Sequence, residues 1–192
     1  MIVIGLVGEK GSGKGTVVEI FKGLQPPKSP IVHLRSSDLL LEIAKLVGVQ
    51  PSEVSRAQLI QLAIDLVKIF GDGCISNGMR EKINRHDGIV IFDGIRLPTD
   101  APIVRSFQKN ILLYITARPE IRFERIKLRK EKAGEEFMTY EQFLSEENLE
   151  TERHIPEIGK TADVRISNNG SYSEFRSHIV RIFDESLKNA SN

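Results

Sequence analysis

Short apolar runs alternate along the chain with longer stretches in which apolar residues recur every three or four positions. The short runs are rich in β-branched residues and almost uninterrupted, which is typical of strands covered on both faces of a sheet. They predict five strands, at 2–7, 31–34, 88–92, 111–115 and 163–167. This alternation predicts an α/β domain with a largely parallel sheet.

The longer stretches predict helices between the strands, at 14–24, 38–47, from Pro51 to Gly71, at 119–132 and from residue 171 onward. Ser171 and Glu174 have the spacing of a capping box at the start of the last helix. Right-handed crossovers bring the loops that follow parallel strands to one edge of the sheet. We therefore expect any ligand to bind at that edge.

Composition and charge narrow the class of protein. The 192 residues are 40% hydrophobic and 28% charged, which fits one globular domain. The net charge of +1 argues against a nucleic-acid partner or a polybasic membrane surface. A single cysteine, Cys74, excludes an internal disulfide framework. With no long apolar run and no signal peptide, we expect a cytoplasmic protein that binds small molecules and neither nucleic acid nor a membrane.

The strongest motif is the phosphate loop, which we define as residues 8–16, reading Gly-Glu-Lys-Gly-Ser-Gly-Lys-Gly-Thr. It follows a predicted strand and opens a predicted helix, as a phosphate-binding loop requires. Glycines let successive N–H groups converge on phosphate oxygens, the helix start adds positive charge, and Lys14 can reach the β- and γ-phosphates. A plain glycine turn is the alternative. The candidate ATP ligands are Gly8, Gly11, Ser12, Gly13, Lys14, Gly15 and Thr16.

The end of this loop resembles the adenylate kinase version of the motif. Gly15 holds the position where phosphate loops usually carry Ser or Thr, and Thr16 follows one residue later. Dephospho-CoA kinases, in contrast, usually have Gly-Lys-Ser or Gly-Lys-Thr. The resemblance makes Thr16 a candidate for contact with a donor phosphate or its magnesium ion, and it favours a nucleotide acceptor.

Asp93-Gly94-Ile95-Arg96 follows the third predicted strand. A carboxylate at a strand end can hold a magnesium-bound water, and an arginine fork suits a phosphate, so Asp93 is a candidate metal residue and Arg96 a candidate acceptor ligand. An ordinary Asp-Gly turn is the alternative. The stretch is similar to Asp-Gly-Phe-Pro-Arg of adenylate kinases, whose arginine grips the acceptor phosphate. The family's adenine-reading glutamine is replaced here by 97–100, so AMP is not specified.

Arg35-Ser-Ser-Asp38-Leu-Leu-Leu41 follows the second predicted strand and resembles the kinase segment Ser-Thr-Gly-Asp-Leu-Leu-Arg. The resemblance makes Asp38 an acceptor-binding residue, or the base if the acceptor is a hydroxyl group. Leu41 stands in place of the family's arginine, and Arg35 could supply that charge. An ordinary helix N-cap at Ser37 or Asp38 is the alternative.

In the segment 118–132, four arginines recur at spacings of four, three and four, which would put them on one face of a helix, namely Arg118, Arg122, Arg125 and Arg129. Either phosphates or nearby glutamates must neutralise them. Arg125 and Arg129 match the two arginines that open the lid of adenylate kinases and neutralise the phosphoryl group in transfer. An acidic stretch follows, and we expect a lid at about 130–155, with a plain acidic helix as the alternative. Asn169-Gly170 resembles the loop that holds the donor adenine in such kinases.

Taken together, the motifs resemble a prokaryotic, adenylate-kinase-like group of small P-loop kinases, often labelled dephospho-CoA kinase or nucleotide kinase. The resemblance implies one kinase domain over 1–192, with a three-layer fold, a five-stranded parallel sheet and acceptor-binding helices at about 36–86. The expected activity is magnesium-dependent transfer of the γ-phosphoryl of ATP to a nucleoside or deoxynucleoside monophosphate. A dephospho-CoA kinase and a slowly hydrolysing switch or assembly ATPase remain open. The expected catalytic residues are Lys14, Arg96, Arg125 and Arg129.

Overall fold

The sheet has the expected number of strands, all parallel. The computed structural model describes residues 1–24, 30–129, 137–149 and 152–191. Its five-stranded sheet has the order β2-β3-β1-β4-β5. The predicted α/β fold is thereby confirmed, with strand ends within a few residues of those expected. The strands are β1 (Ile2–Val7), β2 (Ile31–Arg35), β3 (Ile89–Ile95), β4 (Asn110–Thr116) and β5 (Val164–Ser167).

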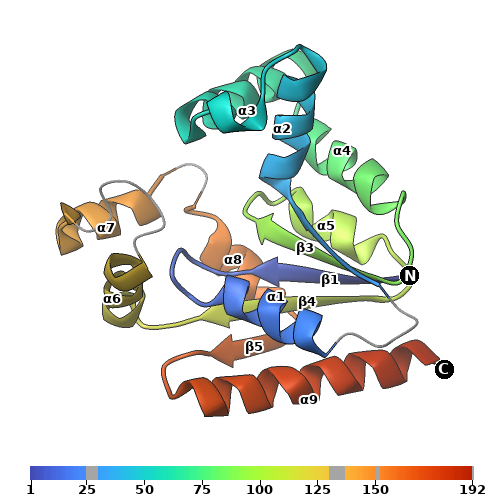
Figure 1. Ribbon diagram of the computed structural model, residues 1–192, viewed down its shortest axis with the longest axis vertical. Coiled ribbons are helices and arrows are strands. Elements are labelled where there is room, and N and C mark those ends of the chain that lie inside the picture. Colours follow the sequence, from blue (N-terminus) through green and yellow to red (C-terminus); the bar gives the residue numbers. More distant parts are fainter. Residues whose placement is uncertain (25–29, 130–136, 150–151, 192) are drawn as a thin grey trace.

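Helices cover both faces of the sheet and give three layers (Figure 1). One apolar cluster joins α1 and α9 to the sheet, and a second joins α4, α5 and α8 to the opposite face. The helices are α1 (Lys14–Gly23), α2 (Ser36–Leu46), α3 (Arg56–Phe70), α4 (Cys74–Ile83), α5 (Asp100–Arg105), α6 (Pro119–Arg129), α7 (Tyr140–Glu147), α8 (Ile155–Lys160) and α9 (Tyr172–Ser191), with a 3-10 turn η1 (Pro51–Glu53).

The central strand β1 shows why the apolar runs are continuous. Its Ile4 and Leu6 belong to the cluster under α1 and α9, whereas Val3 and Val7 belong to the cluster under α4, α5 and α8. All four are at most 1% exposed. A strand buried on both faces needs apolar residues at every position, not at alternate ones.

The helix predicted from Pro51 to Gly71 is wrong at its start. Pro51 begins only the short η1 turn, and α3 begins at Arg56. The reason is a capping box at the later position: Gln58 N donates to Ser55 Oγ at 3.3 Å, and Ser55 N donates to Gln58 Oε1 at 2.8 Å. The helices α4 and α5 were not predicted. The predicted capping box of Ser171 and Glu174 is present at the start of α9.

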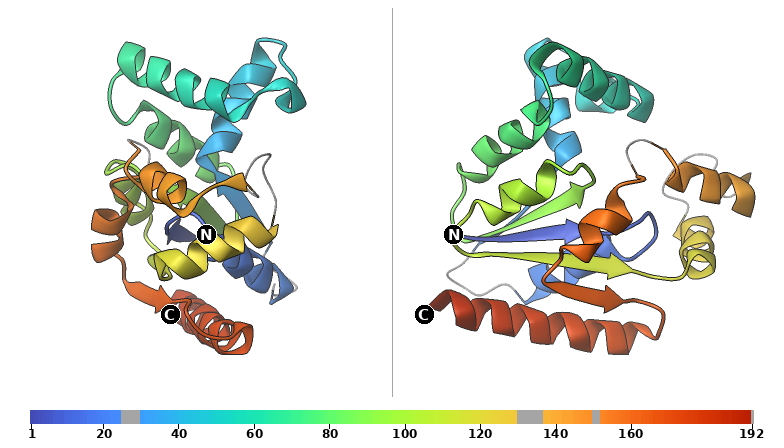
Figure 2. Two further views of the ribbon diagram at one scale, coloured as in Figure 1. Left: turned by 90° about the vertical axis from the view of Figure 1, so that its left-hand side faces the viewer. Right: turned by 180° about the vertical axis from the view of Figure 1, so that it is seen from behind.

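The strand order places a topological switch point at the carboxyl end of β1, which lies between β3 and β4. After β1 the chain crosses to β2 on one side of the sheet, and after β3 it crosses to β4 on the other side. Open α/β sheets bind ligands at such switch points. The helices α2 and α3 stand to one side of this edge, and α6 and α7 lie beyond the strand ends (Figures 1 and 2). Within the described ranges, no helix is both long and apolar enough to cross a membrane.

Candidate functional site

The phosphate loop joins the end of β1 to the start of α1. Gly13 caps α1 with a φ of 108°, and a Cβ there would lie 2.4 Å from Asn168 Nδ2, so both the backbone and the space require glycine. At Gly15 a Cβ would meet nothing within 4 Å, which leaves the start of α1 open. The amides at the start of a helix are the groups that bind phosphate in such loops. Of the predicted donor residues, Gly8, Gly11, Ser12 and Gly13 precede α1, and Lys14, Gly15 and Thr16 lie in its first turn.

Lys14 bends back over its own loop. Its Nζ donates to Gly8 O at 2.6 Å and to Glu9 O at 3.3 Å. Burial lowers the pKa of Lys14, and the nearby charge of Asp93 opposes that shift. Among the described residues this partly buried ammonium donates to two carbonyls, and an anion beside it would be favourable, so Lys14 can serve a phosphate chain.

Asp93 lies near the end of β3 and faces Lys14. His33 Nε2 on the adjacent strand β2 lies 3.3 Å from Asp93 Oδ2. Burial alone would raise the pKa of Asp93, but the hydrogen bond with His33 and the charge of Lys14 outweigh it, so the pKa lies below its usual value. The other oxygen, Oδ1, is buried and has no hydrogen-bond partner among the described residues.

This unpartnered oxygen fits a hydrated magnesium ion. Within the described part of the chain, no group of three or more His, Cys, Asp or Glu side chains could hold a metal. Magnesium in phosphate-transfer sites is usually held by one or two carboxylates, substrate phosphates and several waters, so a larger group is not needed. Asp93 meets that requirement, and Thr16 lies in the first turn of α1 on the loop side.

Arg96 lies just beyond β3, in a turn fixed by a buried carboxylate. Asp100, only 3% exposed, accepts hydrogen bonds at Oδ2 from Arg96 N at 3.0 Å and from Leu97 N at 2.9 Å. Ser76 Oγ on α4 donates to Asp100 Oδ1 at 2.6 Å. The Arg96 side chain, in contrast to its backbone, contacts Glu152: Nη1 donates to Glu152 Oε1 at 2.6 Å. The sequence pattern singled out Arg96, but nothing in it indicated Asp100 or Glu152 as its partners.

Arg35 and Asp38 meet at the start of α2. Asp38 Oδ2 accepts from Arg35 N at 2.8 Å, and Oδ1 accepts from Arg35 Nε at 3.2 Å and Nη2 at 3.1 Å. Both carboxylate oxygens of Asp38 are therefore engaged, one of them in capping the helix. In the sheet register Arg35 lies opposite Asp93, so β2 brings this pair to the same edge as the phosphate loop.

Asn168, which the sequence analysis missed, lies in the loop after β5 and connects that loop to the phosphate loop and to α6. It is 6% exposed; its Nδ2 donates to Ser12 O at 2.9 Å, and its Oδ1 accepts from Arg125 Nη2 at 3.3 Å. Burial lowers the pKa of Arg125. The predicted adenine residue Asn169 accepts at Oδ1 from Arg118 N at 2.8 Å, and Gly170 follows it before α9. The loop after β5 therefore supports both the phosphate loop and α6.

The arginines of α6 do not act as one exposed face. Arg122 is only 4% exposed; it donates to Ala117 O at 2.9 Å and makes a two-pronged pair with Glu147 of α7. Arg129 ends the helix and is exposed. Of the predicted lid, residues 130–136 and 150–151 lie outside the described residues. Its described part includes α7 and the residues that lead into α8.

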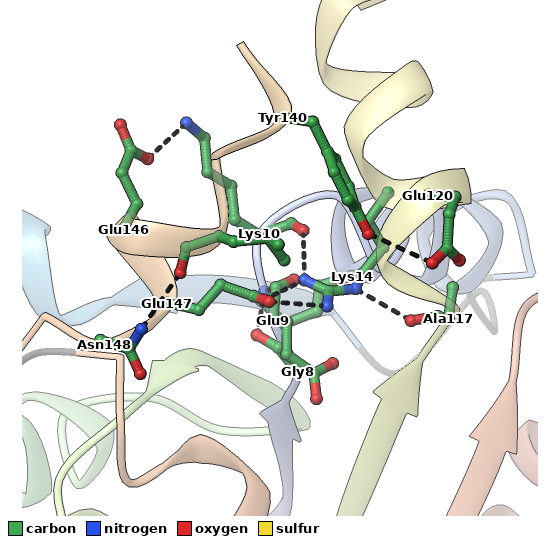
Figure 3. Close-up of polar contacts among 12 residues, drawn as sticks. Gly8, Glu9, Lys10, Lys14, Ala117, Glu120, Tyr140, Glu146, Glu147 and Asn148 are labelled. Carbon is green, nitrogen blue, oxygen red and sulfur yellow. Dashed lines mark hydrogen bonds and ion pairs between the residues drawn. The ribbon is translucent and has the colours of Figure 1, made fainter. Parts of the chain in front are cut away.

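The helix α7 lies against the phosphate loop. Lys10 Nζ donates to Glu146 Oε2 at 2.9 Å, and Figure 3 shows these two side chains reaching toward each other beside Glu147. A pocket of about 260 Å³ opens between the loop and the α7–α8 segment. Glu9, Lys10 and Glu152 are among its lining residues. Tyr114 Oη on β4 donates to Glu9 Oε1, so the loop is also attached to the sheet.

The chain is similar in sequence to proteins of archaea. No family model matches the chain. It is 29% identical to a UPF0200 protein of Pyrococcus horikoshii over 98% of this chain and 99% of that protein. It is 23% identical to a UPF0200 protein of Staphylothermus marinus over 91% of this chain and 87% of that protein.

Solved structures of kinases share the fold. Shikimate kinase from Bacteroides thetaiotaomicron aligns with a TM-score of 0.59 at 14% identity, over 97% of this chain and 98% of that one. Dephospho-CoA kinase from Campylobacter jejuni aligns with a TM-score of 0.52 at 16% identity, over 96% of each chain. The fold of this protein is therefore that of the P-loop kinases.

Proposed function

We propose that the protein is a magnesium-dependent phosphotransferase that moves the γ-phosphoryl group of ATP to a nucleoside or deoxynucleoside monophosphate, with the whole chain acting as one kinase domain. The observation that carries the proposal is the convergence of Lys14, Asp93 and Arg96 at one edge of a P-loop kinase fold, where the charges of Asp93 and Arg96 both act on Lys14. Phosphoryl transfer depends on positioning and charge stabilisation, and these three groups supply both.

The donor side would hold ATP through the amides of the phosphate loop and Lys14. The open space at Gly15 leaves room for the phosphate chain, and Asn169 and Gly170 are the candidate adenine residues. Asp93 Oδ1 would hold magnesium through water, with Thr16 as the second metal or phosphate contact. When bound, the ion neutralises phosphate charge. Lys14, Arg96, Arg125 and Arg129 would stabilise the negative charge of the group in transfer.

The state of Asp38 supports a monophosphate acceptor. A hydroxyl acceptor must lose its proton, so it needs a carboxylate base close to the transferred group. Asp38 is the candidate base, yet both of its oxygens accept hydrogen bonds from Arg35. A phosphate monoester is already anionic at neutral pH and needs no base. Arg35, Asp38 and Arg96 would then position the acceptor rather than activate it.

The test is a transfer assay with labelled ATP, magnesium and one acceptor at a time. The panel contains the ribo- and deoxyribonucleoside monophosphates and dephospho-CoA. Stoichiometric labelling of a monophosphate supports the proposal. Labelling of dephospho-CoA alone overturns the acceptor and leaves a kinase that needs a base. ADP release at one slow rate, whatever the acceptor, overturns the kinase and favours a nucleotide-operated switch.

A further inference from the structure

The Arg96 side chain forms an ion pair with Glu152, and among the described residues this is its one hydrogen-bonded contact. Its Nη1 donates to Glu152 Oε1 at 2.6 Å. The Arg96 side chain is 40% exposed, whereas that of Glu152 is 12% exposed. A guanidinium has five N–H donors, and among the described residues only this one contact uses them. Glu152 is therefore held on the Arg96 fork by a single hydrogen bond, which an anion that bonds the fork at two points can replace.

Arg122 provides a comparison within the same molecule, because its contacts are those of an arginine that stabilises the fold. It is 4% exposed, bonds both oxygens of Glu147, and donates to the carbonyl groups of Ala117 and Lys10. Removing either partner of that pair would leave buried groups unsatisfied. The contact of Arg96 with Glu152 has none of these features on the arginine side, so architecture alone does not account for it.

The carboxylate of Glu152 lies among the charges that a phosphate would meet. The charges of Glu152, Arg96 and Asp93 all act on Lys14. Glu152 also lines the pocket beside the phosphate loop. A carboxylate hydrogen-bonded to an arginine fork occupies the place of phosphate oxygens on that fork.

Glu152 is carried by an anchored segment. Its backbone N donates to Leu149 O at 2.8 Å, and Ile155 N donates to Glu152 O at 3.0 Å. Ile155 and Ile158 of α8 are buried against the sheet. The carboxylate is thus held near Arg96 at a high effective concentration, and it competes with every anion that approaches the arginine.

We propose that Glu152 is a specificity-determining residue of the acceptor site, acting as an intramolecular competitor for Arg96; this inference rests on the proposed function. A phosphate monoester carries more charge than a carboxylate and has three acceptor oxygens, so it displaces Glu152 and bonds the fork at two points. A neutral hydroxyl group gains nothing by displacing a carboxylate. Glu152 therefore selects acceptors that bear a phosphate.

The experiment measures anion binding by calorimetry after the donor site has been filled with magnesium and a non-hydrolysable ATP analogue. The probe is inorganic phosphate, compared among the wild type, Glu152→Gln, Arg96→Ala and the double variant. Glu157→Gln is the matched control, because Glu157 lies five residues after Glu152, on α8, and pairs with the exposed Lys160. Glu152→Gln should bind phosphate about five-fold more tightly, the upper end for loss of a partly exposed ion pair. The gain should vanish in the double variant.

Unchanged or weaker phosphate binding by Glu152→Gln overturns the inference, as does an equal gain in Glu157→Gln. The proposed function is judged separately, by transfer to the monophosphate panel. If the phosphate gain appears but no monophosphate is labelled, the competitor is confirmed and the acceptor class is wrong. If a monophosphate is labelled without any phosphate gain, the kinase stands and Glu152 has no such role.

Discussion

The donor half and the acceptor half of the site are built in different ways. In the donor half, Lys14 donates to backbone carbonyls of its own loop and Asn168 supports that loop from below. In the acceptor half, Arg35 and Arg96 are partly exposed and each holds a carboxylate, of Asp38 and Glu152 respectively. Under the proposed function the donor half is preorganised, whereas the acceptor half would exchange a protein carboxylate for its substrate.

The two kinds of contact have different consequences: fixed contacts hold the donor half in shape, and displaceable contacts select the ligand of the acceptor half. Backbone carbonyls cannot leave the loop, so the donor half offers one fixed arrangement to the phosphate chain that all nucleotides share. Carboxylates on side chains can be displaced, and only a ligand that competes with them binds well. The substitutions below test this division.

The largest effect is expected at Lys14. Lys14→Ala should lower the rate of transfer by about 10²–10³-fold, because it removes a preorganised charge from the transferred phosphate. The fold should persist, since the side chain contacts loop carbonyls rather than the apolar core. Steady-state transfer and circular dichroism measure the two effects. Lys22→Ala is the control, because Lys22 on the same helix forms an exposed pair with Glu19. Turnover near the wild-type value in Lys14→Ala would rule out the assigned role.

Arg122 should matter for stability more than Arg96 does. Arg122→Ala should lower the free energy of unfolding by about 2–3 kcal/mol, because it breaks several buried hydrogen bonds to Glu147 and to backbone carbonyls. Arg96→Ala should lower it by less, about 1 kcal/mol, since it removes one hydrogen bond in which Arg96 is 40% exposed and Glu152 is 12% exposed. Urea unfolding of both variants decides the matter. Equal losses would show that the contrast between the two arginines is wrong.

Arg96→Ala should instead act on the acceptor. We expect about tenfold weaker binding of the monophosphate that proves to be the substrate, because a charge-assisted hydrogen bond is lost. ATP binding should change little, because the donor amides and Lys14 are intact. Titrations of each nucleotide with the other absent measure both constants. A parallel loss for ATP would place Arg96 on the donor side.

The separation of contacting residues along the chain explains what the sequence could predict. The phosphate loop was recognisable because its residues are contiguous and follow a strand. Asn168 was missed because its contact with Ser12 spans 156 positions, and no local pattern distinguishes it from the neighbouring Asn169. The partner of Arg96 lies 56 positions away, on a segment that a composition argument describes only as acidic. Such contacts follow from sheet register and helix packing, which a single sequence does not specify.

The arginine spacing on α6 shows a related limit. Helical periodicity placed four arginines on one helix, but only Arg122, Arg125 and Arg129 lie on α6, because Arg118 precedes its first residue, Pro119. Periodicity also could not predict that Arg122 is buried against Glu147 while Arg129 is exposed. Burial of a charged residue depends on where a partner of opposite charge lies in the folded chain. Periodicity identifies a face of a helix, and only packing decides what covers it.

The smallest expected effect concerns the attachment of the donor loop to the sheet. Burial and the hydrogen bond to Glu9 raise the pKa of Tyr114 to about 12. Because the protonated phenol is favoured in the folded protein, its stabilising contribution is complete below about pH 10 and is lost as the pH rises toward about 12. Tyr114→Phe should therefore lose up to about 1 kcal/mol at neutral pH, and the difference from the wild type should shrink across that interval.

Urea unfolding at a series of alkaline pH values measures this difference, with Tyr140→Phe as the matched control. Tyr140 donates to Glu120 at 3.1 Å at the surface, and its substitution leaves the donor loop attached. Other groups titrate in the same range, but they cancel when each variant is compared with the wild type. A Tyr114→Phe curve parallel to the wild type throughout would mean that the bond to Glu9 does not stabilise the loop. The donor half would then be fixed by Asn168 and its own turn alone.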